Sequence, residues 1–266
     1  MSQDITARTV RISDLVPSVK RAMKRKRPVF IWGPPGVGKS EVVEGIATEL
    51  GGIAIDIRLG MYEPTDIRGM PYYDKNTGKM VWAPPIDLPT EEMAAKYPVV
   101  VLFLDEMNQA SPSVQGAAFQ LILNRKVGQY TLPENVVVVA AGNRETDKGV
   151  TFRMPTPLRN RFTHLELAVN FDDWQDWAVK NNIHPDVVGY LNFAKSDLFD
   201  FDPRASGNAF ASPRSWTFVS EYLYDEEDDV DVTDNQLTDL IAGTVGEGIA
   251  VKFNTCLLYT SDAADD

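Results

Sequence analysis

Eight consecutive residues, Gly33 to Ser40, have the types and spacing of a loop that binds phosphate, because they fit the pattern G-x-x-x-x-G-K-[S/T]. Glycines let the backbone pass close to a phosphate, so that N–H groups and a helix N-terminus can face the anion. Lys39 would reach the β- and γ-phosphates, and the Ser40 hydroxyl would bind Mg²⁺. The alternative is a chance Gly/Pro turn before a helix. The predicted nucleotide-binding residues are Gly33, Pro34, Pro35, Gly36, Val37, Gly38, Lys39 and Ser40.

Polar residues also follow two further apolar runs. Asp105 and Glu106 come directly after the run 99–104, which suits a strand buried on both faces of a parallel sheet. Beside a phosphate loop, we expect Asp105 to be a Mg²⁺ partner and Glu106 the general base for water. The alternative is an ordinary surface loop after a strand. Asn143 follows the run 136–141, and its amide could orient the attacking water.

The segments around these residues predict alternating strands and helices. One helix follows the phosphate loop, and another begins at Ser111 with Pro112 in its first position. A first helix near the N-terminus has Ser13 as a possible N-cap. Residues 70–83 contain two short strand-like runs around a turn-rich segment, which predicts a β-hairpin. The predicted strands of the sheet are 28–32, 53–58, 99–104, 136–141 and 164–168.

Beyond residue 168 the apolar residues take helical spacing. We therefore predict a nucleotide-binding domain over residues 1–168 and a helical lid over 169–255. The acidic run 225–231 reads as a solvated connector. The residues at helical spacing are Trp174, Trp177, Val179, Val187, Val188, Leu191, Phe193, Trp216, Phe218, Val219 and Tyr222. The aromatic residues among them are predicted to form a core rather than a cofactor site.

Composition sets limits on the class of protein. The 266 residues are 44% hydrophobic and 24% charged, which is ordinary for a globular protein. No run of 18 apolar residues exists, so no membrane span is expected. The N-terminus lacks the apolar segment of a secretory signal, and we expect a cytoplasmic protein. A net charge of −12 argues against broad binding of nucleic acid.

A basic cluster at residues 20–27 is the exception to this acidic balance. It contains Lys20, Arg21, Lys24, Arg25, Lys26 and Arg27. One interpretation is a nucleic-acid patch. The other is a set of cations at the C-terminus of a helix, where they favour the helix dipole.

The last eleven residues, 256–266, form a segment of a different kind. They closely resemble the translation of a transposase adapter used to prepare sequencing libraries. This indicates that the reading frame was cut near Thr255, that the lid is truncated and that the tail is non-native. The alternative is a short natural tail. The tail contains Cys256, the single cysteine of the sequence.

Taken in order, five motifs resemble those of the AAA+ ATPases, and specifically the MoxR-like branch. The hairpin at 70–83 is similar to the insertion that marks the helix-2-insert clade. The resemblance implies an αβα sandwich with a five-stranded parallel sheet, a helical lid, hydrolysis of ATP with Mg²⁺, and a homo-hexameric ring. The matching segments are 33–40 (Walker A), 102–110 (Walker B), 141–143 (sensor 1), 158–162 (arginine-finger region) and 211–215 (sensor 2).

The same resemblance assigns three arginines. The finger region contains Arg159 and Arg161, and the family pattern favours Arg161, which lies next to Phe162. A finger in this family reaches the γ-phosphate held by the adjacent subunit. Arg214 is similar to the sensor 2 arginine, which the lid places on the phosphate. The implied catalytic set is Glu106, Asn143, Arg161 and Arg214.

Three functions compete at this point. The first is a MoxR-like chaperone that remodels partner proteins or inserts metals or cofactors into them, often with a von Willebrand A-domain partner. The second is an AAA+ nucleic-acid motor, such as a helicase or a restriction-type subunit, which only the cluster at 20–27 supports. The third is a nucleotide-gated scaffold without hydrolysis, which the acidic pair at 105–106 argues against.

Overall fold

The structure is a computed structural model that describes residues 7–147, 151–205, 207–224 and 232–262, with side chains described as far as Leu257. The acidic run 225–231 and the last four residues of the tail lie outside the described residues.

Strands and helices alternate along much of the first part of the chain, and helices follow. The strands are β1 (Arg8–Val10), β2 (Val29–Trp32), β3 (Ile53–Arg58), β4 (Met70–Asp74), β5 (Lys79–Ala83), β6 (Val100–Asp105), β7 (Lys126–Val127), β8 (Tyr130–Thr131), β9 (Val136–Gly142) and β10 (Thr163–Leu167). The helices are α1 (Ile12–Lys24), α2 (Lys39–Glu49), α3 (Pro64–Arg68), α4 (Glu91–Ala94), α5 (Pro112–Asn124), α6 (Thr156–Arg159), α7 (Phe171–Lys180), α8 (Pro185–Phe193), α9 (Pro213–Leu223), α10 (Asp234–Val245) and α11 (Glu247–Asp262).

The chain divides into two compact units. Among the described residues, the first unit contains 7–35, 39–147 and 151–168, and the second contains 36–38, 169–205, 207–224 and 232–262. Their roles as a nucleotide-binding domain and a lid stay predictions.

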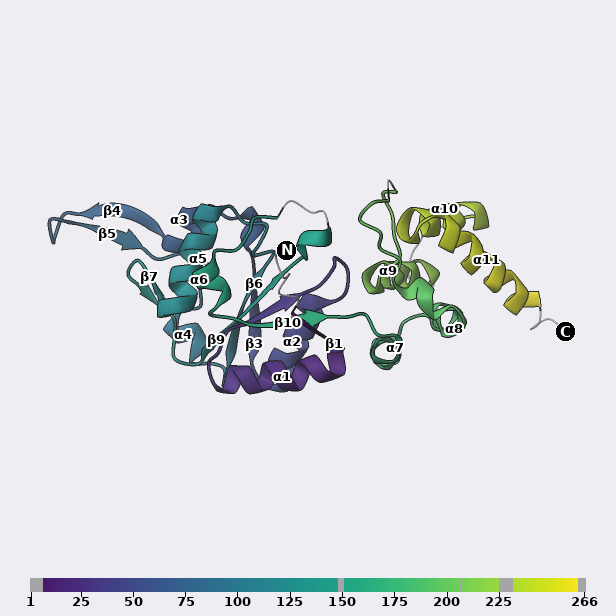
Figure 1. Cartoon of the computed structure of the whole chain (residues 1–266), viewed down its shortest axis with the longest axis horizontal. Helices are drawn as coiled ribbons and strands as arrows, with labels where there is room; N and C mark the ends of the chain where they lie inside the picture. The colour runs from purple at the N-terminus through teal and green to yellow at the C-terminus, as the bar shows by residue number, and fades with distance from the viewer. Residues whose placement is uncertain (1–6, 148–150, 206, 225–231, 263–266) are drawn as a thin grey trace, which may run out of the picture. The chain divides into compact units, whose positions relative to one another are not determined.

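A parallel sheet forms the centre of the first unit, with the strand order β1-β10-β2-β9-β6-β3 (Figure 1). All neighbouring strands run parallel, so their carboxyl ends meet at one edge of the sheet. In the register of β2 and β9, Trp32 pairs with Gly142. The segments that follow β2, β6 and β9 therefore begin side by side, at the edge where open α/β sheets bind ligands.

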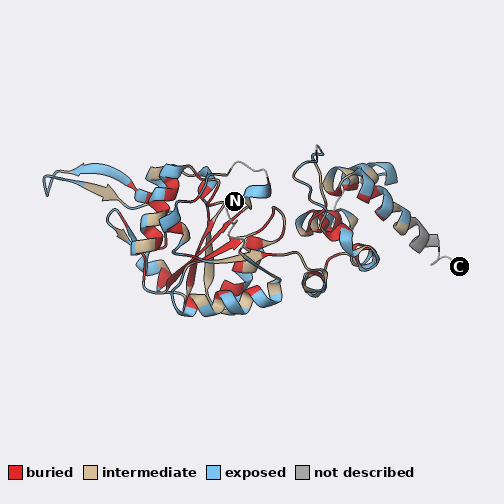
Figure 2. Cartoon of the chain, in the orientation of Figure 1, coloured by how far each residue is buried: buried red, intermediate tan, exposed pale blue. Residues whose placement is uncertain are grey.

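Helices cover both faces of this sheet. On one face, α1 and α2 pack against strands that include β2, β6 and β10. On the other face lies α5, whose Val114 and Leu121 belong to the same buried apolar cluster as Leu102 of β6. Figure 2 shows the strands as the buried layer between exposed helix surfaces. The α/β sandwich predicted from the sequence is confirmed, because the continuous apolar runs are strands shielded on both sides.

The sheet has one strand more than the five predicted. β1 is only three residues long and pairs with β10 at the edge of the sheet, with Arg8 opposite Leu165 and Val10 opposite Leu167. So short a strand leaves no periodic signal in a sequence.

Two helix starts illustrate how local sequence sets the boundaries. At α5 the prediction is confirmed, since Ser111 caps the helix through the N–H of Val114 and Pro112 follows it. At α1 the prediction is wrong. The helix begins at Ile12 after Arg11, which makes no side-chain cap, and Ser13 lies inside the first turn.

The hairpin predicted at residues 70–83 is present as β4 and β5, which pair antiparallel from Met70 opposite Ala83 to Asp74 opposite Lys79. The carboxylate of Asp74 accepts hydrogen bonds from the N–H of Asn76 and the hydroxyl of Thr77, which close the turn and lower the Asp74 pKa.

The second unit is helical around its own apolar core. Trp216 and Phe253 are fully buried there and contact each other edge to face, with ring centroids 5.5 Å apart. Trp174 and Trp216, two of the aromatic residues predicted for the core, are buried, as are Val187, Leu191 and Val219. The prediction is wrong for three other aromatic residues, because helical spacing does not identify which face packs. These exposed residues are Phe193, Phe218 and Tyr222.

The second unit also contains the start of the segment predicted to be non-native. Helix α11 runs through Thr255 to Asp262, and Cys256 and Leu257 are partly buried against the core. That residues 256–266 are non-native stays a prediction. Among the described helices, none combines the length and the apolar composition that crossing a membrane requires.

Candidate functional site

The phosphate-type loop joins the end of β2 to the start of α2. Gly36 and Gly38 have φ angles of 76° and 82°, a left-handed conformation that glycine adopts without steric cost. Lys39 and Ser40 are the first two residues of α2. The sequence thus forms the strand, tight loop and helix N-terminus that an anion site of this kind needs.

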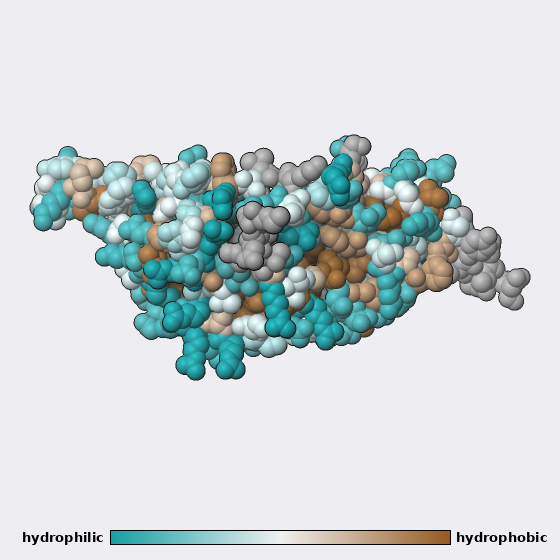
Figure 3. Space-filling model, in the orientation of Figure 1, coloured by the Kyte–Doolittle hydropathy of each residue, from teal (hydrophilic) through white to brown (hydrophobic). Residues whose placement is uncertain are grey.

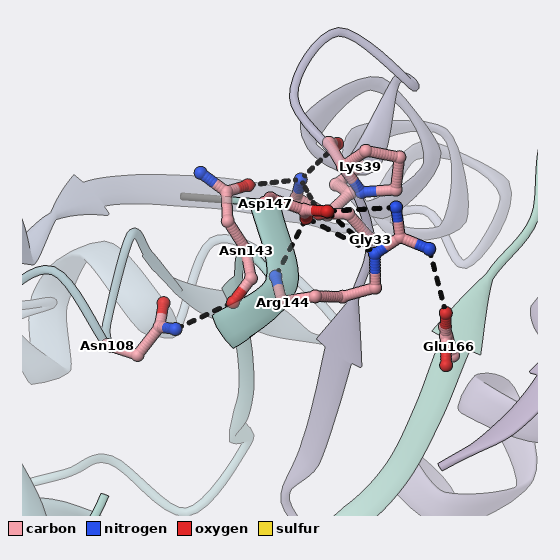
Figure 4. A network of polar contacts seen from close by, with 8 residues as sticks. Gly33, Lys39, Asn108, Asn143, Arg144, Asp147 and Glu166 are labelled. Carbon is pink, nitrogen blue, oxygen red and sulfur yellow. Dashed lines mark hydrogen bonds and ion pairs between the residues drawn. The ribbon is translucent and has the colours of Figure 1, made fainter. Parts of the chain in front are cut away.

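The ammonium group of Lys39 lies against oxygen acceptors. Its Nζ donates hydrogen bonds of 2.9 Å to the carbonyl oxygens of Gly33 and Pro34 and one of 3.1 Å to Oδ1 of Asn143 (Figure 4). Lys39 is 8% exposed, and a buried cation requires such partners. The structure therefore brings Asn143, 104 residues away in sequence, into contact with the loop lysine.

Two predicted metal ligands also lie together. The Ser40 hydroxyl is 3.4 Å from Oδ2 of Asp105, and Oδ1 of Asp105 accepts a 2.8 Å hydrogen bond from the N–H of Glu106. Mg²⁺ prefers oxygen ligands and commonly binds through one or two side chains while keeping waters and substrate phosphates. The Ser40–Asp105 pair fits that donor set. In the described ranges, no group of three or more His, Cys, Asp or Glu is placed to hold a metal.

A further carboxylate, Asp56 on β3, contributes to the charge of this edge. Its pKa is raised, first by burial and then by the negative charge of Asp105, with a smaller contribution from Glu106. The guanidinium of Arg58 opposes this shift. Asp56 was not singled out from the sequence, because an acidic residue within a strand pattern does not reveal which loops it meets.

Glu106 has an unusual backbone. Its φ of 52° lies in the left-handed region, which costs a non-glycine residue about 1–2 kcal/mol. Its side chain lies beside Gly60, where an added Cβ would be 3.1 Å from Oε2 of Glu106. A strained residue held in place by its surroundings is a candidate for function.

Asn108 is a site residue that sequence reasoning missed. Its Nδ2 donates a 2.7 Å hydrogen bond to the backbone carbonyl of Asn143 (Figure 4). Asn108 is 2% exposed, and its Oδ1 is buried without a hydrogen-bond partner. A Cβ at Gly142 would lie only 2.3 Å from this oxygen, so the contact requires glycine there. Asn108 thus connects the segment after β6 to the segment after β9.

Arg144 fixes the same segment from its other side. Its guanidinium lies 2.9 Å from Oδ1 of the buried Asp147 and 3.2 Å from Oε1 of Glu166 on β10 (Figure 4). Burial alone would lower the Arg144 pKa, but these two carboxylates outweigh burial and raise it. Asn143 is therefore flanked by a residue anchored to two elements of the first unit.

We expect Asn108→Asp to slow the ATP hydrolysis predicted from the sequence about 10- to 100-fold, because it replaces the donor to the Asn143 carbonyl by an oxygen and leaves buried groups unpaired. The measurement is kcat for ATP, with ATP affinity changing less than kcat. Asn124→Asp, at an exposed position on α5, is the matched control. A normal kcat for Asn108→Asp would show that this contact does not position Asn143.

The predicted arginines lie in different places. Arg161 is exposed between α6 and β10. Arg159 is half-buried, donates from Nη2 to the Thr156 hydroxyl at 3.3 Å, and has a buried Nε without a partner. Arg214 is an exposed residue of α9 in the second unit. The catalytic roles of Arg161 and Arg214 stay predictions.

Comparison with known proteins gives matches over the same region. Residues 29–168 match the ATPase family associated with various cellular activities (AAA), which is more than half of the chain. Midasin of Giardia intestinalis is 24% identical over 181 residues, which cover 65% of this chain and 4% of midasin. The Lon protease of Aquifex aeolicus is 27% identical over 182 residues, which cover 62% of this chain and 21% of that protein. This chain therefore spans a small part of the length of these relatives.

Among solved structures, NtrX from Brucella abortus has a similar fold, with a TM-score of 0.53, 14% identity and coverage of 92% of this chain and 56% of that chain. A second structure of NtrX, in complex with ADP, has a TM-score of 0.50 and 16% identity over 85% of this chain and 52% of that chain. At these identities the likeness concerns the fold.

Proposed function

Because this chain belongs to the AAA family of ATPases, we propose that it hydrolyses ATP as a subunit of a homo-hexameric ring, in the manner of the MoxR-like branch. The energy of hydrolysis serves to remodel partner proteins or to insert metals or cofactors into them, with a von Willebrand A-domain protein as a candidate partner. The observation that carries the ATPase proposal is the contact of Lys39 with Asn143 beside the Ser40–Asp105 pair.

Each residue of this constellation has a defined task. Lys39 binds the β- and γ-phosphates in place of the loop carbonyls. Ser40 and Asp105 would hold Mg²⁺, which would supply positive charge beside the phosphates when bound. Glu106 accepts the proton of the attacking water, and Asn143 orients that water.

The arginines complete the proposed site. Arg161 stabilises the charge that develops on the transferring phosphoryl group of the adjacent subunit. Its exposure on the first unit supports a role between subunits, whereas Arg159 is half-buried. Arg214 contributes a second cation from the helical unit.

The charge distribution favours a protein client over nucleic acid. The net charge is −12. Within the basic cluster, Lys20 pairs with Glu49 and Lys26 pairs with Glu134, so part of its charge is compensated inside the chain. Figure 3 shows the hydrophilic surface over α1, which carries much of this cluster. These cations are better placed to favour the helix C-terminus than to form a binding stripe.

We expect Lys39→Ala to weaken ATP binding at least about 10- to 100-fold, because a charged hydrogen bond contributes about 1.5–3 kcal/mol. Titration with a fluorescent ATP analogue measures the change. Lys20→Ala is the matched control, since it removes an equal charge outside the loop and should leave affinity unchanged. Unchanged affinity in Lys39→Ala would refute the nucleotide site.

ATPase assays with DNA test the choice of client. We expect neither single- nor double-stranded DNA to stimulate hydrolysis at low salt. Stimulation that falls steeply with added salt, and that is lost when Lys24 and Arg25 are replaced by Glu, would favour the nucleic-acid motor instead.

A further inference from the structure

His164 on β10 makes hydrogen bonds from both nitrogens of its ring. Its Nδ1 lies 3.0 Å from Nε1 of Trp32, and its Nε2 lies 2.7 Å from the backbone carbonyl oxygen of Arg159. In the sequence, His164 is a histidine without companions at metal-ligand spacing. Its contact with Trp32 cannot be predicted there, because the two residues are 132 positions apart.

The chemistry of the partners fixes the proton on this ring. An indole N–H can only donate, so Nδ1 of His164 accepts the hydrogen bond from Trp32. The Arg159 carbonyl can only accept, so Nε2 carries the proton and donates to it. His164 is therefore neutral in one defined tautomer, and each of its nitrogens holds a different segment.

The two segments are those that bear on hydrolysis. Trp32 is the last residue of β2 and is bonded directly to Gly33, whose carbonyl accepts from Lys39. Arg159 is the last residue of α6, two positions before Arg161. A single imidazole thus joins the strand that leads into the phosphate loop to the segment that bears the predicted finger.

Aromatic packing stiffens the same connection. The rings of Trp32 and His164 stack with their centroids 6.0 Å apart, and the ring centroids of Phe30 and Trp32 are 4.3 Å apart. Phe162 packs edge-on against Phe30 at 5.4 Å and is 8% exposed. Arg161 is exposed, but the chain on either side of it is anchored, at the Arg159 carbonyl by a hydrogen bond and at Phe162 by ring packing.

We propose that His164 is a positioning residue for Arg161, which it holds in register with the phosphate loop of its own chain through the Trp32–His164–Arg159 connection. This inference rests on the proposed function, in which Arg161 acts on the nucleotide of a neighbouring subunit. His164 touches no substrate in this scheme. Its effect is on the rate of hydrolysis and not on the affinity for ATP.

The test compares two substitutions of one residue. His164→Phe keeps an aromatic ring but loses both hydrogen bonds, whereas His164→Gln supplies an acceptor and a donor on one side chain. We expect His164→Phe to lower kcat about 10- to 100-fold, as small misplacements of catalytic groups do, with KM for ATP within about 2-fold. His164→Gln should restore most of the lost rate. If His164 had a purely structural role, His164→Phe would lower the melting temperature without lowering kcat selectively over KM.

A double substitution identifies the residue through which His164 acts. In an Arg161→Ala background, His164→Phe should cause no further loss of kcat. Three outcomes would each overturn the inference. In the first, the losses of kcat from His164→Phe and Arg161→Ala multiply in the double variant. In the second, His164→Phe raises KM with unchanged kcat, and in the third, Arg161→Ala is slow while His164→Phe has a normal kcat. If His164→Phe fails to fold, Trp32→Phe removes the same donor and is held to the same outcomes. A normal kcat in Arg161→Ala would instead refute the proposed finger, and this inference with it.

Discussion

Arg161→Ala should retain ATP binding and hydrolyse ATP about 10³- to 10⁵-fold more slowly, the range measured for arginine fingers. The guanidinium stabilises charge that exists only in the transition state, so its loss lowers kcat and leaves affinity intact. Arg159→Ala should be milder, because that side chain is half-buried and contacts Thr156 of its own helix. The exposed Arg153→Ala is the control for a loss of surface charge. The measurement is steady-state kcat beside nucleotide binding.

Mixing inactive variants tests whether the finger acts between subunits. A Lys39→Ala subunit supplies a finger without a working nucleotide site, and an Arg161→Ala subunit supplies the reverse. Mixed assemblies should therefore recover part of the activity that each variant lacks alone. An absence of recovery in assembled mixtures would place the action of Arg161 within its own subunit, or remove it from the mechanism.

Glu106→Gln should bind ATP normally and hydrolyse it about 10²- to 10⁴-fold more slowly, the usual contribution of a general base. The amide keeps the shape of the side chain beside Gly60 but accepts a proton far less readily. Single-turnover hydrolysis with radiolabelled ATP measures the chemical step directly. Glu145→Gln, at an exposed position after β9, should hydrolyse at the normal rate. A normal rate in Glu106→Gln would place the base elsewhere.

Local patterns were sufficient for much of the fold. Continuous apolar runs indicated strands covered on both faces, as β6 and β9 are. The phosphate loop was recognisable because its chemistry depends on neighbours in the sequence, from Gly33 to Ser40. The convergence of Asp105 and Asn143 could also be expected, because parallel strands place their carboxyl ends at one edge.

Contacts that depend on long-range register could not be predicted. Asn108 reaches the Asn143 carbonyl only because Gly142 leaves space for its amide. His164 meets Trp32 only because β10 pairs directly with β2. The exposed Phe193 is a failure of the opposite kind, since helical spacing predicts that some face is buried but not which one.

The left-handed backbone of Glu106 sets stability against activity at a single position. Glycine would adopt this conformation without the steric cost that a side chain bears there. Replacing Glu106 by glycine therefore removes steric strain from the folded state at that residue. The same change would delete the carboxylate proposed as the base. A search for thermostable variants would therefore be drawn towards inactive ones at residue 106, as is common where a site holds a strained residue. Stabilising changes are better sought away from the carboxyl edge of the sheet.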